Sequence, residues 1–117
     1  MAGVCSVQNV VEANGNVYPC DFYALDEYCL GNYNQDKYAR IQECQAARDF
    51  TARSRRLSKR CRACDFYDLC RGGCFRNRVR ESEGEGWENI FCPGYRRFFE
   101  ECLDRLKGIA GDMSFLG

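Results

Sequence analysis

Histidine is absent from this chain, so any metal site has to be built from cysteine thiolates or carboxylates. A net charge is also lacking, because 17 Lys and Arg balance 17 Asp and Glu, and this removes any overall attraction to nucleic acid or to a membrane. No apolar run approaches the roughly 20 residues that span a bilayer. The opening residues, MAGVCSVQNVVEANG, have neither the basic start nor the apolar stretch of a secretory signal. We therefore expect a cytoplasmic protein that binds neither nucleic acid nor a membrane.

Cysteine, in contrast, is abundant, with ten in 117 residues, a density at which cysteines usually define the scaffold. Four of them, Cys61, Cys64, Cys70 and Cys74, follow the spacing C-x2-C-x5-C-x3-C. A secreted disulfide scaffold is one explanation of such a composition. The C-x2-C pair favours a metal site instead, because a tight turn aims both sulfurs at one point.

Four closely spaced thiolates suit either one zinc ion or a cubane iron–sulfur cluster. Gly72 and Gly73, just before Cys74, favour the cluster, because glycines adopt unusual dihedral angles and let backbone N–H groups approach cluster sulfides. A compact zinc ribbon more often has two C-x2-C pairs, and this segment has one. The spacing alone favours iron–sulfur and leaves zinc as the alternative.

The N-terminal half predicts a β-hairpin over residues 5–23, with its turn at NGN and the second strand either ending at Pro19 or lying at an edge. This hairpin can bring Cys5 and Cys20 together at its open end. Residues 25–35 are rich in turn residues and predict a loop. A helix is expected over about 36–53, with Asp36 as its cap.

In the C-terminal half, the cysteine-rich residues 61–74 predict short turns with one helical turn at DFYDLC, and residues 81–89 an acidic loop. The clearest helix is expected over about 93–107, starting at Pro93 and stopping at Gly108, with a frayed tail after it. Its apolar stripe follows the 3.6-residue period and is expected to pack in the core: Tyr95, Phe98, Phe99, Leu103 and Leu106. We also expect Cys44 and Cys102 to pack as small hydrophobes rather than bind metal.

These elements predict a single small α+β domain over residues 1–117, cysteine-rich and stabilised by metal. The hairpin is followed by helices and irregular cluster-binding loops. Because the apolar core is small for the chain length, metal binding and folding should be coupled.

The wider cysteine pattern resembles a known family. Cys5 and Cys20 flank Gly15 as C-x9-G-x4-C, the C-x2-C-x5-C-x3-C segment follows, and Cys92 completes the set. This is similar to the seven-cysteine signature of the SPASM domain, a C-terminal extension of radical SAM enzymes that modify peptides. Three stretches look most like the anaerobic sulfatase-maturating enzymes, which oxidise a cysteine or serine of a sulfatase to formylglycine: GNVYPCDFY with LGN downstream, CRACDFYDLCRGGCFRNR and FCPGYRRFFEECL.

The resemblance implies two auxiliary [4Fe–4S] clusters, each with four cysteine ligands. One would be bound by Cys61, Cys64, Cys70 and Cys92. The other would use Cys5, Cys20 and Cys74 plus a cysteine before the hairpin, which this sequence lacks, and Cys29 is a weak substitute. Zinc could replace iron in recombinant protein.

The resemblance also implies a catalytic role for Asp21, as the base that deprotonates the target side chain. The C-x3-C-x2-C motif of the radical SAM core, which binds S-adenosylmethionine, does not occur here. We therefore expect the chain to be the C-terminal domain of a longer enzyme, with its core domain and a sulfatase peptide as partners. The alternatives are the same domain in a maturase of another peptide, and a zinc-stabilised interaction module without redox activity.

Two further groups of residues have an ordinary and a functional interpretation. The basic run from Arg53 to Arg62 is expected to be a solvated face, and otherwise to offset the negative charge of a cluster. The aromatic residues of the two DFY segments are expected to pack around the clusters, and otherwise to line a substrate groove: Phe22, Tyr23, Phe66 and Tyr67.

Overall fold

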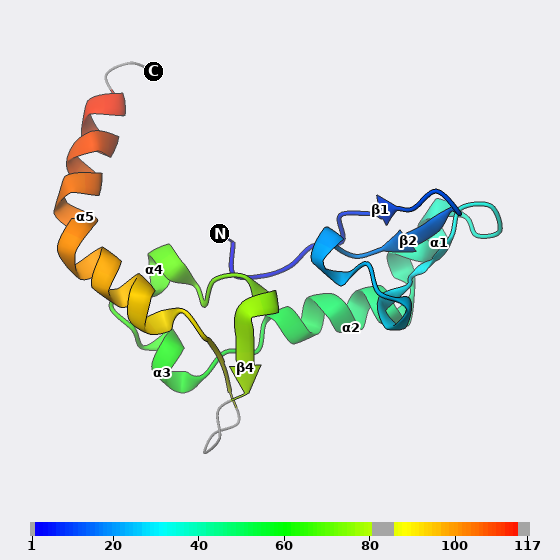
Figure 1. The fold of residues 1–117 in the computed structure, drawn as a ribbon, viewed down its shortest axis with the longest axis horizontal. Coiled ribbons are helices and arrows are strands. Elements are labelled where there is room, and N and C mark those ends of the chain that lie inside the picture. Colours follow the sequence, from blue (N-terminus) through cyan, green and yellow to red (C-terminus); the bar gives the residue numbers. More distant parts are fainter. Residues whose placement is uncertain (1, 81–85, 115–117) are drawn as a thin grey trace. The chain divides into compact units, whose positions relative to one another are not determined.

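The computed structural model describes residues 2–80 and 86–114, with residues 113 and 114 described by their backbone alone. Contacts between residues divide the chain into two compact units, an N-terminal unit of Ala2–Leu57 and a C-terminal unit that begins at Ser58 (Figure 1). No helix within the described residues is both long and apolar enough to cross a membrane.

The N-terminal unit contains a three-stranded antiparallel sheet in the order β1-β2-β3, with β1 at Val10–Val11, β2 at Asn16–Tyr18 and β3 at Gly31–Asn32. The turn between β1 and β2 lies at the expected NGN, where Gly15 has a φ of +89°. β2 is the central strand and ends at Tyr18, directly before Pro19, because proline cannot donate a hydrogen bond to the sheet.

The expectation that residues 25–35 form only a loop is wrong in part. This segment contains a 3-10 turn at Asp26–Tyr28 and the short strand β3. β3 is fixed by pairing with a distant strand: Leu30 N donates to Val17 O, and Asn32 Nδ2 donates to Asn16 Oδ1 at 2.9 Å. Asparagine and glycine in a two-residue strand give no local β signal.

The helix expected over 36–53 is two helices, α1 at Tyr38–Glu43 and α2 at Gln45–Ser54. Cys44 separates them with an extended backbone at ψ 155°, while its carbonyl accepts from Arg48 N. Its side chain packs against the apolar core, which confirms the expected packing role. No Gly or Pro stands at this position to predict a helix break from the sequence. The contact of Cys44 with the core is consistent with the break.

Asp36 does not cap α1, which is a second correction. Lys37 occupies the cap position with an extended backbone and no side-chain cap bond. The Asp36 carboxylate instead accepts from Asn32 N at 3.0 Å and forms an ion pair with Arg40 at 2.6 Å. It therefore ties the end of β3 to the first turn of α1.

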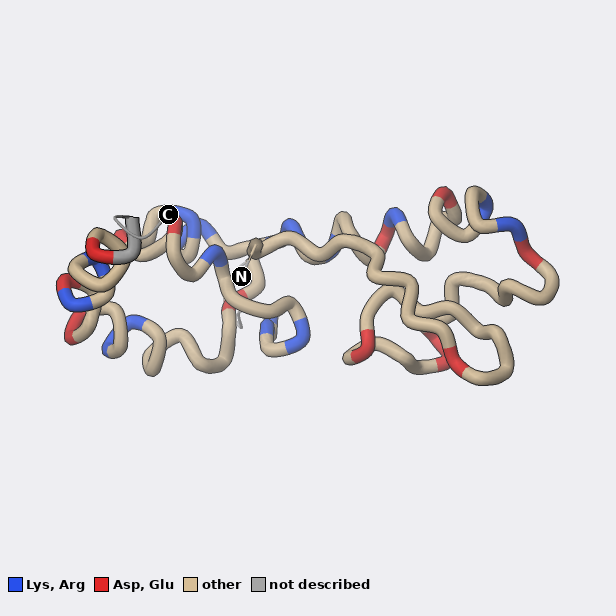
Figure 2. The backbone as a smooth tube through the Cα atoms, turned by 90° about the horizontal axis from the view of Figure 1, so that it is seen from above, with Lys and Arg blue, Asp and Glu red and all other residues tan. Residues whose placement is uncertain are grey.

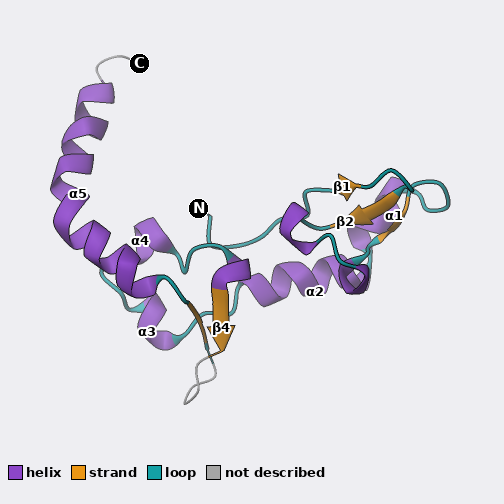
Figure 3. Ribbon diagram, in the orientation of Figure 1, coloured by secondary structure: helices purple, strands orange, loops and turns teal. Residues whose placement is uncertain are grey.

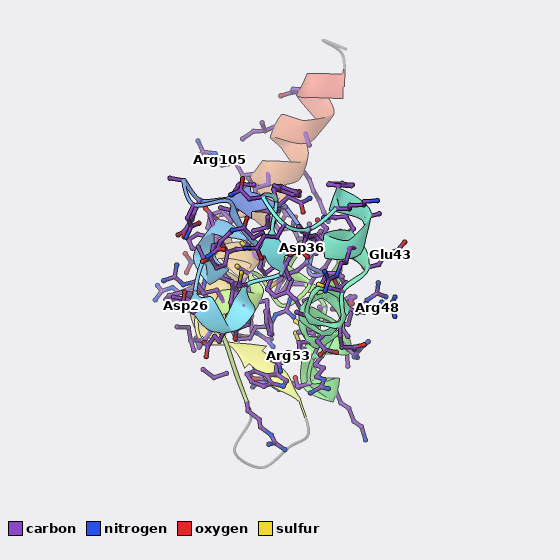
Figure 4. The ribbon with its side chains drawn as sticks, turned by 90° about the vertical axis from the view of Figure 1, so that its right-hand side faces the viewer. Asp26, Asp36, Glu43, Arg48, Arg53 and Arg105 are labelled. Atoms are coloured by element: carbon purple, nitrogen blue, oxygen red, sulfur yellow. The ribbon has the colours of Figure 1, made fainter. Side chains whose placement is uncertain are left out.

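The apolar core of the N-terminal unit is a cluster of Val17, Leu30, Ile41 and Ala47, and Tyr18 and Phe50 are also buried. Charged side chains such as Asp26, Glu43 and Arg48 are exposed and lie around the outside of this unit (Figure 4). In the C-terminal unit, by contrast, the buried described residues are glycines or polar: Ser58, Gly72, Gly73, Arg78, Gly86 and Asn89.

The C-terminal unit starts with two single-turn helices, α3 at Lys59–Arg62 and α4 at Tyr67–Cys70, the second of which is the expected turn at DFYDLC (Figure 3). A 3-10 turn at Phe75–Asn77 leads into β4 at Arg78–Arg80, which pairs antiparallel with β5 at Trp87–Asn89. The expectation of an acidic loop over 81–89 is therefore wrong for 87–89, and residues 81–85 lie outside the described part. Both strands consist mainly of charged or polar residues, so the sequence gives only a weak prediction of β structure there.

The last helix, α5, runs over Cys92–Ser114 and is longer than the expected 93–107. Gly108 does not stop it, because one glycine costs a helix only about 1 kcal/mol and no capping turn follows. Acidic and basic residues are interspersed along α5 (Figure 2), and Arg97 pairs with Glu101 at 2.9 Å. Opposite charges four residues apart stabilise such a helix.

The expected core stripe of α5 is only partly buried. Tyr95, Phe99, Cys102 and Leu103 are half-buried, whereas Phe98 is 49 % exposed and Leu106 is 39 % exposed. The prediction that Phe98 and Leu106 belong to the core is wrong for this chain, because the elements that pack on α5 cover only part of its apolar face.

Candidate metal centre

Four cysteines of the C-terminal unit line one cavity. Cys61 comes from α3, Cys64 from the turn after it, Cys70 from the end of α4, and Cys92 from the start of α5. All ten cysteines are free thiols in the structure. Cys74, the last member of the spacing motif, does not line this cavity. The fold thus assembles the set that the family resemblance implied, rather than the four nearest neighbours in sequence.

Cys61 is held by Ser58, the N-cap of α3. The Ser58 hydroxyl accepts from Cys61 N at 3.0 Å and donates to Glu88 Oε1 at 2.7 Å. The backbone N–H of Ser58 also donates to the carbonyl of Trp87. Ser58 therefore connects the helix that carries Cys61 to strand β5. The next thiol of the cavity, Cys64, follows in a tight turn in which Cys64 N donates to Cys61 O.

Beyond Cys70 the chain makes an unusual turn. Arg71, Gly72 and Gly73 all have positive φ, at +50°, +79° and +60°. Gly72 itself lines the cavity. A Cβ atom at Gly73 would lie 2.5 Å from Asn89 Nδ2, so this position requires glycine for both its backbone and its surroundings. The unusual dihedral angles expected of both glycines are present.

Two buried side chains from the β4–β5 pair hold this turn. Arg78 Nε donates to Gly72 O at 3.0 Å, and its Nη2 donates to Gly73 O at 2.9 Å and Arg71 O at 3.3 Å. Asn89 Nδ2 donates to Gly72 O at 3.2 Å, and its Oδ1 accepts from Phe91 N at 2.9 Å, directly before α5. Asn89 thereby connects the glycine turn to the helix that carries Cys92.

The rest of the lining combines aromatic and charged side chains. Phe66, Tyr95 and Phe99 are apolar parts of it, and the rings of Phe66 and Phe99 lie 5.5 Å apart. Part of the α5 stripe, Tyr95 and Phe99, therefore faces the cysteines. Arg60 and Glu88 also line the cavity and form a two-point ion pair, at 2.9 and 2.5 Å.

The basic run is mainly an exposed face, as expected, since each of its Arg and Lys residues is exposed. Arg60 is the member that also faces the cavity.

The thiols of the cavity influence one another. Burial raises the pKa of the Cys61 thiol, and the nearby Cys70, Cys92 and Glu88 raise it further, while Arg78 opposes them. Burial also raises the pKa of Cys92, and Arg60 opposes this shift. Without a cation in the cavity, the thiols of Cys61 and Cys92 therefore stay protonated to higher pH, as their raised pKa requires. A bound metal would reverse this preference, because only the thiolate is a good ligand.

The donor set fits an iron–sulfur cluster, because four thiols surround one cavity. Among residues 2–80 and 86–114, no group of three or more Cys, Asp or Glu side chains is found that could hold a metal ion. A cubane cluster bonds each thiolate to a different iron and so keeps the sulfurs apart.

In the N-terminal unit, Cys5 and Cys20 lie near the open end of the hairpin. Burial raises the pKa of Cys20, the backbone N–H of Phe22 lowers it, and the charges of Asp21 and Cys5 raise it again. Cys5 is therefore within electrostatic reach of Cys20. Cys5 N also donates to Ser54 Oγ at 2.8 Å. Cys74 belongs to the C-terminal unit, so the second ligand set stays a prediction.

Asp21 is exposed at the start of a 3-10 turn, Asp21–Tyr23. Its Oδ1 accepts from Phe22 N at 3.0 Å and from Cys20 Sγ at 3.2 Å. Of its aromatic neighbours, Tyr23 packs edge-on against Tyr28 and Phe50, whereas Phe22 is exposed. Cys29 donates to Gly31 O at 3.5 Å. The base role of Asp21 stays a prediction.

Sequence reasoning missed Ser58, Arg78, Glu88 and Asn89. Two of these had a local signal: Ser58 stands at a cap position three residues before Cys61, and Asn89 stands just before a helix start. Arg78 and Glu88 had none, since their positions depend on strand pairing.

A family model described as an iron–sulfur cluster-binding domain, SPASM, matches residues 4–65. The chain is 35 % identical over 98 % of its length to a cysteine-type anaerobic sulfatase-maturating enzyme of Clostridium novyi. It is also 35 % identical, over 86 % of its length, to a serine-type enzyme of Bacteroides thetaiotaomicron. It spans 31 % and 25 % of these two relatives, respectively.

Solved structures give the same result. The chain matches one described as native anSMEcpe with bound AdoMet, at a TM-score of 0.86 and 37 % identity over 95 % of its length. It also matches native anSMEcpe with bound AdoMet and Kp18Cys peptide, at a TM-score of 0.87 and 37 % identity. It covers 30 % and 31 % of those chains.

Proposed function

Because the chain belongs to the SPASM family of iron–sulfur cluster-binding domains, we propose that it is the auxiliary-cluster domain of a radical SAM sulfatase maturase. The observation that carries the proposal is the cavity lined by four cysteines from three separate helices and one turn. The likeness to sulfatase-maturating enzymes over nearly the whole chain supports it. The parent enzyme would oxidise a cysteine or serine of a sulfatase to formylglycine in the cytoplasm.

In this proposal, Cys61, Cys64, Cys70 and Cys92 bind one complete [4Fe–4S] cluster, which supplies an electron acceptor when bound. Gly72 and Gly73 let the backbone approach it, and Phe66, Tyr95 and Phe99 limit the access of water. Cys5, Cys20 and Cys74 contribute to a second cluster that lacks one ligand from this chain.

Asp21 is proposed to take the proton from the thiol or hydroxyl of the target side chain. Its exposed carboxylate follows Cys20 directly, so it is accessible to a peptide and adjacent to a cluster ligand. The peptide and an N-terminal radical SAM core domain that binds S-adenosylmethionine are the proposed partners. Peptide-bound solved relatives support the first of these.

The deciding experiment measures iron, acid-labile sulfide and zinc per chain after anaerobic reconstitution, together with the absorption spectrum. About four irons and four sulfides are expected from the complete site, and about eight if the second site also assembles. Stoichiometric zinc without sulfide, under excess iron, would overturn the proposal and favour the zinc module.

A pair of matched variants tests the ligand set. Cys92→Ala should remove the complete cluster, whereas Cys102→Ala, on the same helix but outside the cavity lining, should retain it. Equal iron contents in the two variants would contradict the assignment of Cys92.

A further inference from the structure

Cys61 lies on a helix that needs support from outside. Helix α3 has only four residues, and a single helical turn is not stable by itself in water. The position of the Cys61 thiol therefore depends on the contacts that attach α3 to the rest of the C-terminal unit. Two of these contacts end on the same side chain, that of Glu88 in β5.

The first contact runs through the buried Ser58, whose hydroxyl has a single hydrogen to donate. That hydrogen goes to Glu88 Oε1 at 2.7 Å, which leaves the oxygen of the hydroxyl to accept from Cys61 N at 3.0 Å. An ionised carboxylate can only accept hydrogen bonds. Glu88 therefore sets the direction of the hydroxyl that holds Cys61.

The second contact is with Arg60, directly before Cys61. Its Nε donates to Glu88 Oε1 at 2.9 Å and its Nη2 to Oε2 at 2.5 Å, so both carboxylate oxygens are engaged. The Glu88 side chain is only 16 % exposed, and its backbone is fixed by the pairing of β5 with β4. Glu88 also lies four residues before Cys92. One carboxylate thus connects the segments that carry the first and the last thiol of the cavity.

The segment around Cys70 is held by other groups. Gly73 N donates to Cys70 O at 2.8 Å, and the side chains of Arg78 and Asn89 donate to Gly72 O. Loss of the Glu88 carboxylate should therefore displace Cys61 before it disturbs Cys70.

The consequence for a bound cluster follows from its composition. In a [4Fe–4S] cluster each cysteine is bonded to a different iron, so a displaced thiolate leaves its own iron without a protein ligand. A [4Fe–4S]²⁺ cluster that releases this iron as Fe²⁺ becomes [3Fe–4S]⁰. We propose that Glu88 is a positioning residue that keeps Cys61 bonded to its iron, acting through Ser58 and Arg60. The inference rests on the proposed function and adds to it the residue that keeps the cluster complete.

The test measures iron and acid-labile sulfide per anaerobically reconstituted chain, in a Cys5→Ser, Cys20→Ser background that restricts the measurement to the complete site. Electron paramagnetic resonance follows one-electron oxidation with the mild dye thionine, which converts [3Fe–4S]⁰ to paramagnetic [3Fe–4S]⁺. Glu88→Ala removes the carboxylate, whereas Glu88→Gln keeps an acceptor oxygen. Cys61→Ala is the reference for loss of this ligand. Glu101→Ala is the control, since Glu101 also pairs with an arginine but does not line the cavity.

The parent, E88Q and E101A should each contain about four irons per chain, whereas E88A should contain about three and give the [3Fe–4S]⁺ signal of C61A. Unchanged iron in E88A without that signal would overturn the inference, as would a signal that differs from that of C61A. Loss of all iron from E88A, or an equal loss from E101A, would also overturn it, because the effect would then not be specific to Cys61. If the parent chain itself takes up no iron and sulfide, the proposed function fails instead.

Discussion

Gly73 occupies a position that has no room for a side chain. Its φ is +60°, and a Cβ atom would lie 2.5 Å from Asn89 Nδ2 and 3.3 Å from Tyr95 Cε2. Asn89 cannot move freely, because it also binds Gly72 O and Phe91 N. A substitution here therefore affects the turn after Cys70 and the start of α5 together.

We predict that Gly73→Ala lowers the free energy of unfolding by about 2 kcal/mol, from backbone strain and from displacement of Asn89. Urea denaturation of the anaerobically reconstituted chain measures this. Gly94→Ala is the matched control, since a Cβ there meets no atom within 4 Å. The prediction fails if both alanine variants unfold at the same urea concentration.

At the scale of elements, Ser58 joins α3 to β5 through three hydrogen bonds, to Cys61 N, Glu88 Oε1 and Trp87 O. Its side chain makes the first two, so Ser58→Ala should destabilise the chain by about 1–2 kcal/mol. The exposed Ser6→Ala is the control. Thermal unfolding followed by circular dichroism compares them, and equal midpoints would show that the cap contributes nothing.

The second half of α5 is separable from the cavity. Tyr95 and Phe99 line the cavity from its first two turns, whereas a Cβ at Gly108 meets no atom within 4 Å. Gly108→Pro should therefore reduce helicity, because proline breaks a helix interior at about 3 kcal/mol, without lowering iron content. Gly108→Ala should increase helix stability by about 0.5–1 kcal/mol.

Far-UV circular dichroism and iron analysis of the same samples test this separation. A loss of iron in Gly108→Pro that exceeds the loss in Gly108→Ala would mean that the end of α5 supports the cavity after all.

At the scale of the whole molecule, the two units are stabilised differently. The apolar core of the chain lies within residues 2–57, and the buried residues described after Leu57 are polar or glycine. The N-terminal unit can bury apolar surface by itself, whereas the C-terminal unit depends on hydrogen bonds and on what its cysteines bind. Metal binding and folding are then coupled mainly in the C-terminal unit.

Removing iron with a chelator should therefore increase amide hydrogen exchange in residues 58–114 much more than in residues 2–57. Hydrogen exchange with mass spectrometry on reconstituted and stripped chain resolves the two ranges. An equal increase in both would contradict this division of stability.

Much of the fold followed from local signals in the sequence. The NGN turn, the helical turn at DFYDLC and the 3.6-residue stripe of α5 each depend on residues close together in the chain. The errors have two causes: β3 and the break at Cys44 depend on contacts with residues farther away in the sequence, whereas β5 pairs with the preceding strand and was missed because its polar residues give a weak β signal. Burial of Phe98 and Leu106 was overestimated because a periodic stripe shows which face is apolar, not how much of it is covered.

The sequence by itself determined the chemistry of this protein. With ten cysteines and no histidine, a metal site had to be thiolate-based, and the spacing with its two glycines favoured iron–sulfur. The family resemblance implied that Cys92 joins Cys61, Cys64 and Cys70, and the tertiary structure brings these four cysteines to one cavity. Only the tertiary structure showed that Arg78 and Asn89 hold the turn after Cys70. The reason is physical: ligand type is a property of single residues, whereas a cavity and its charge arise from contacts between distant ones.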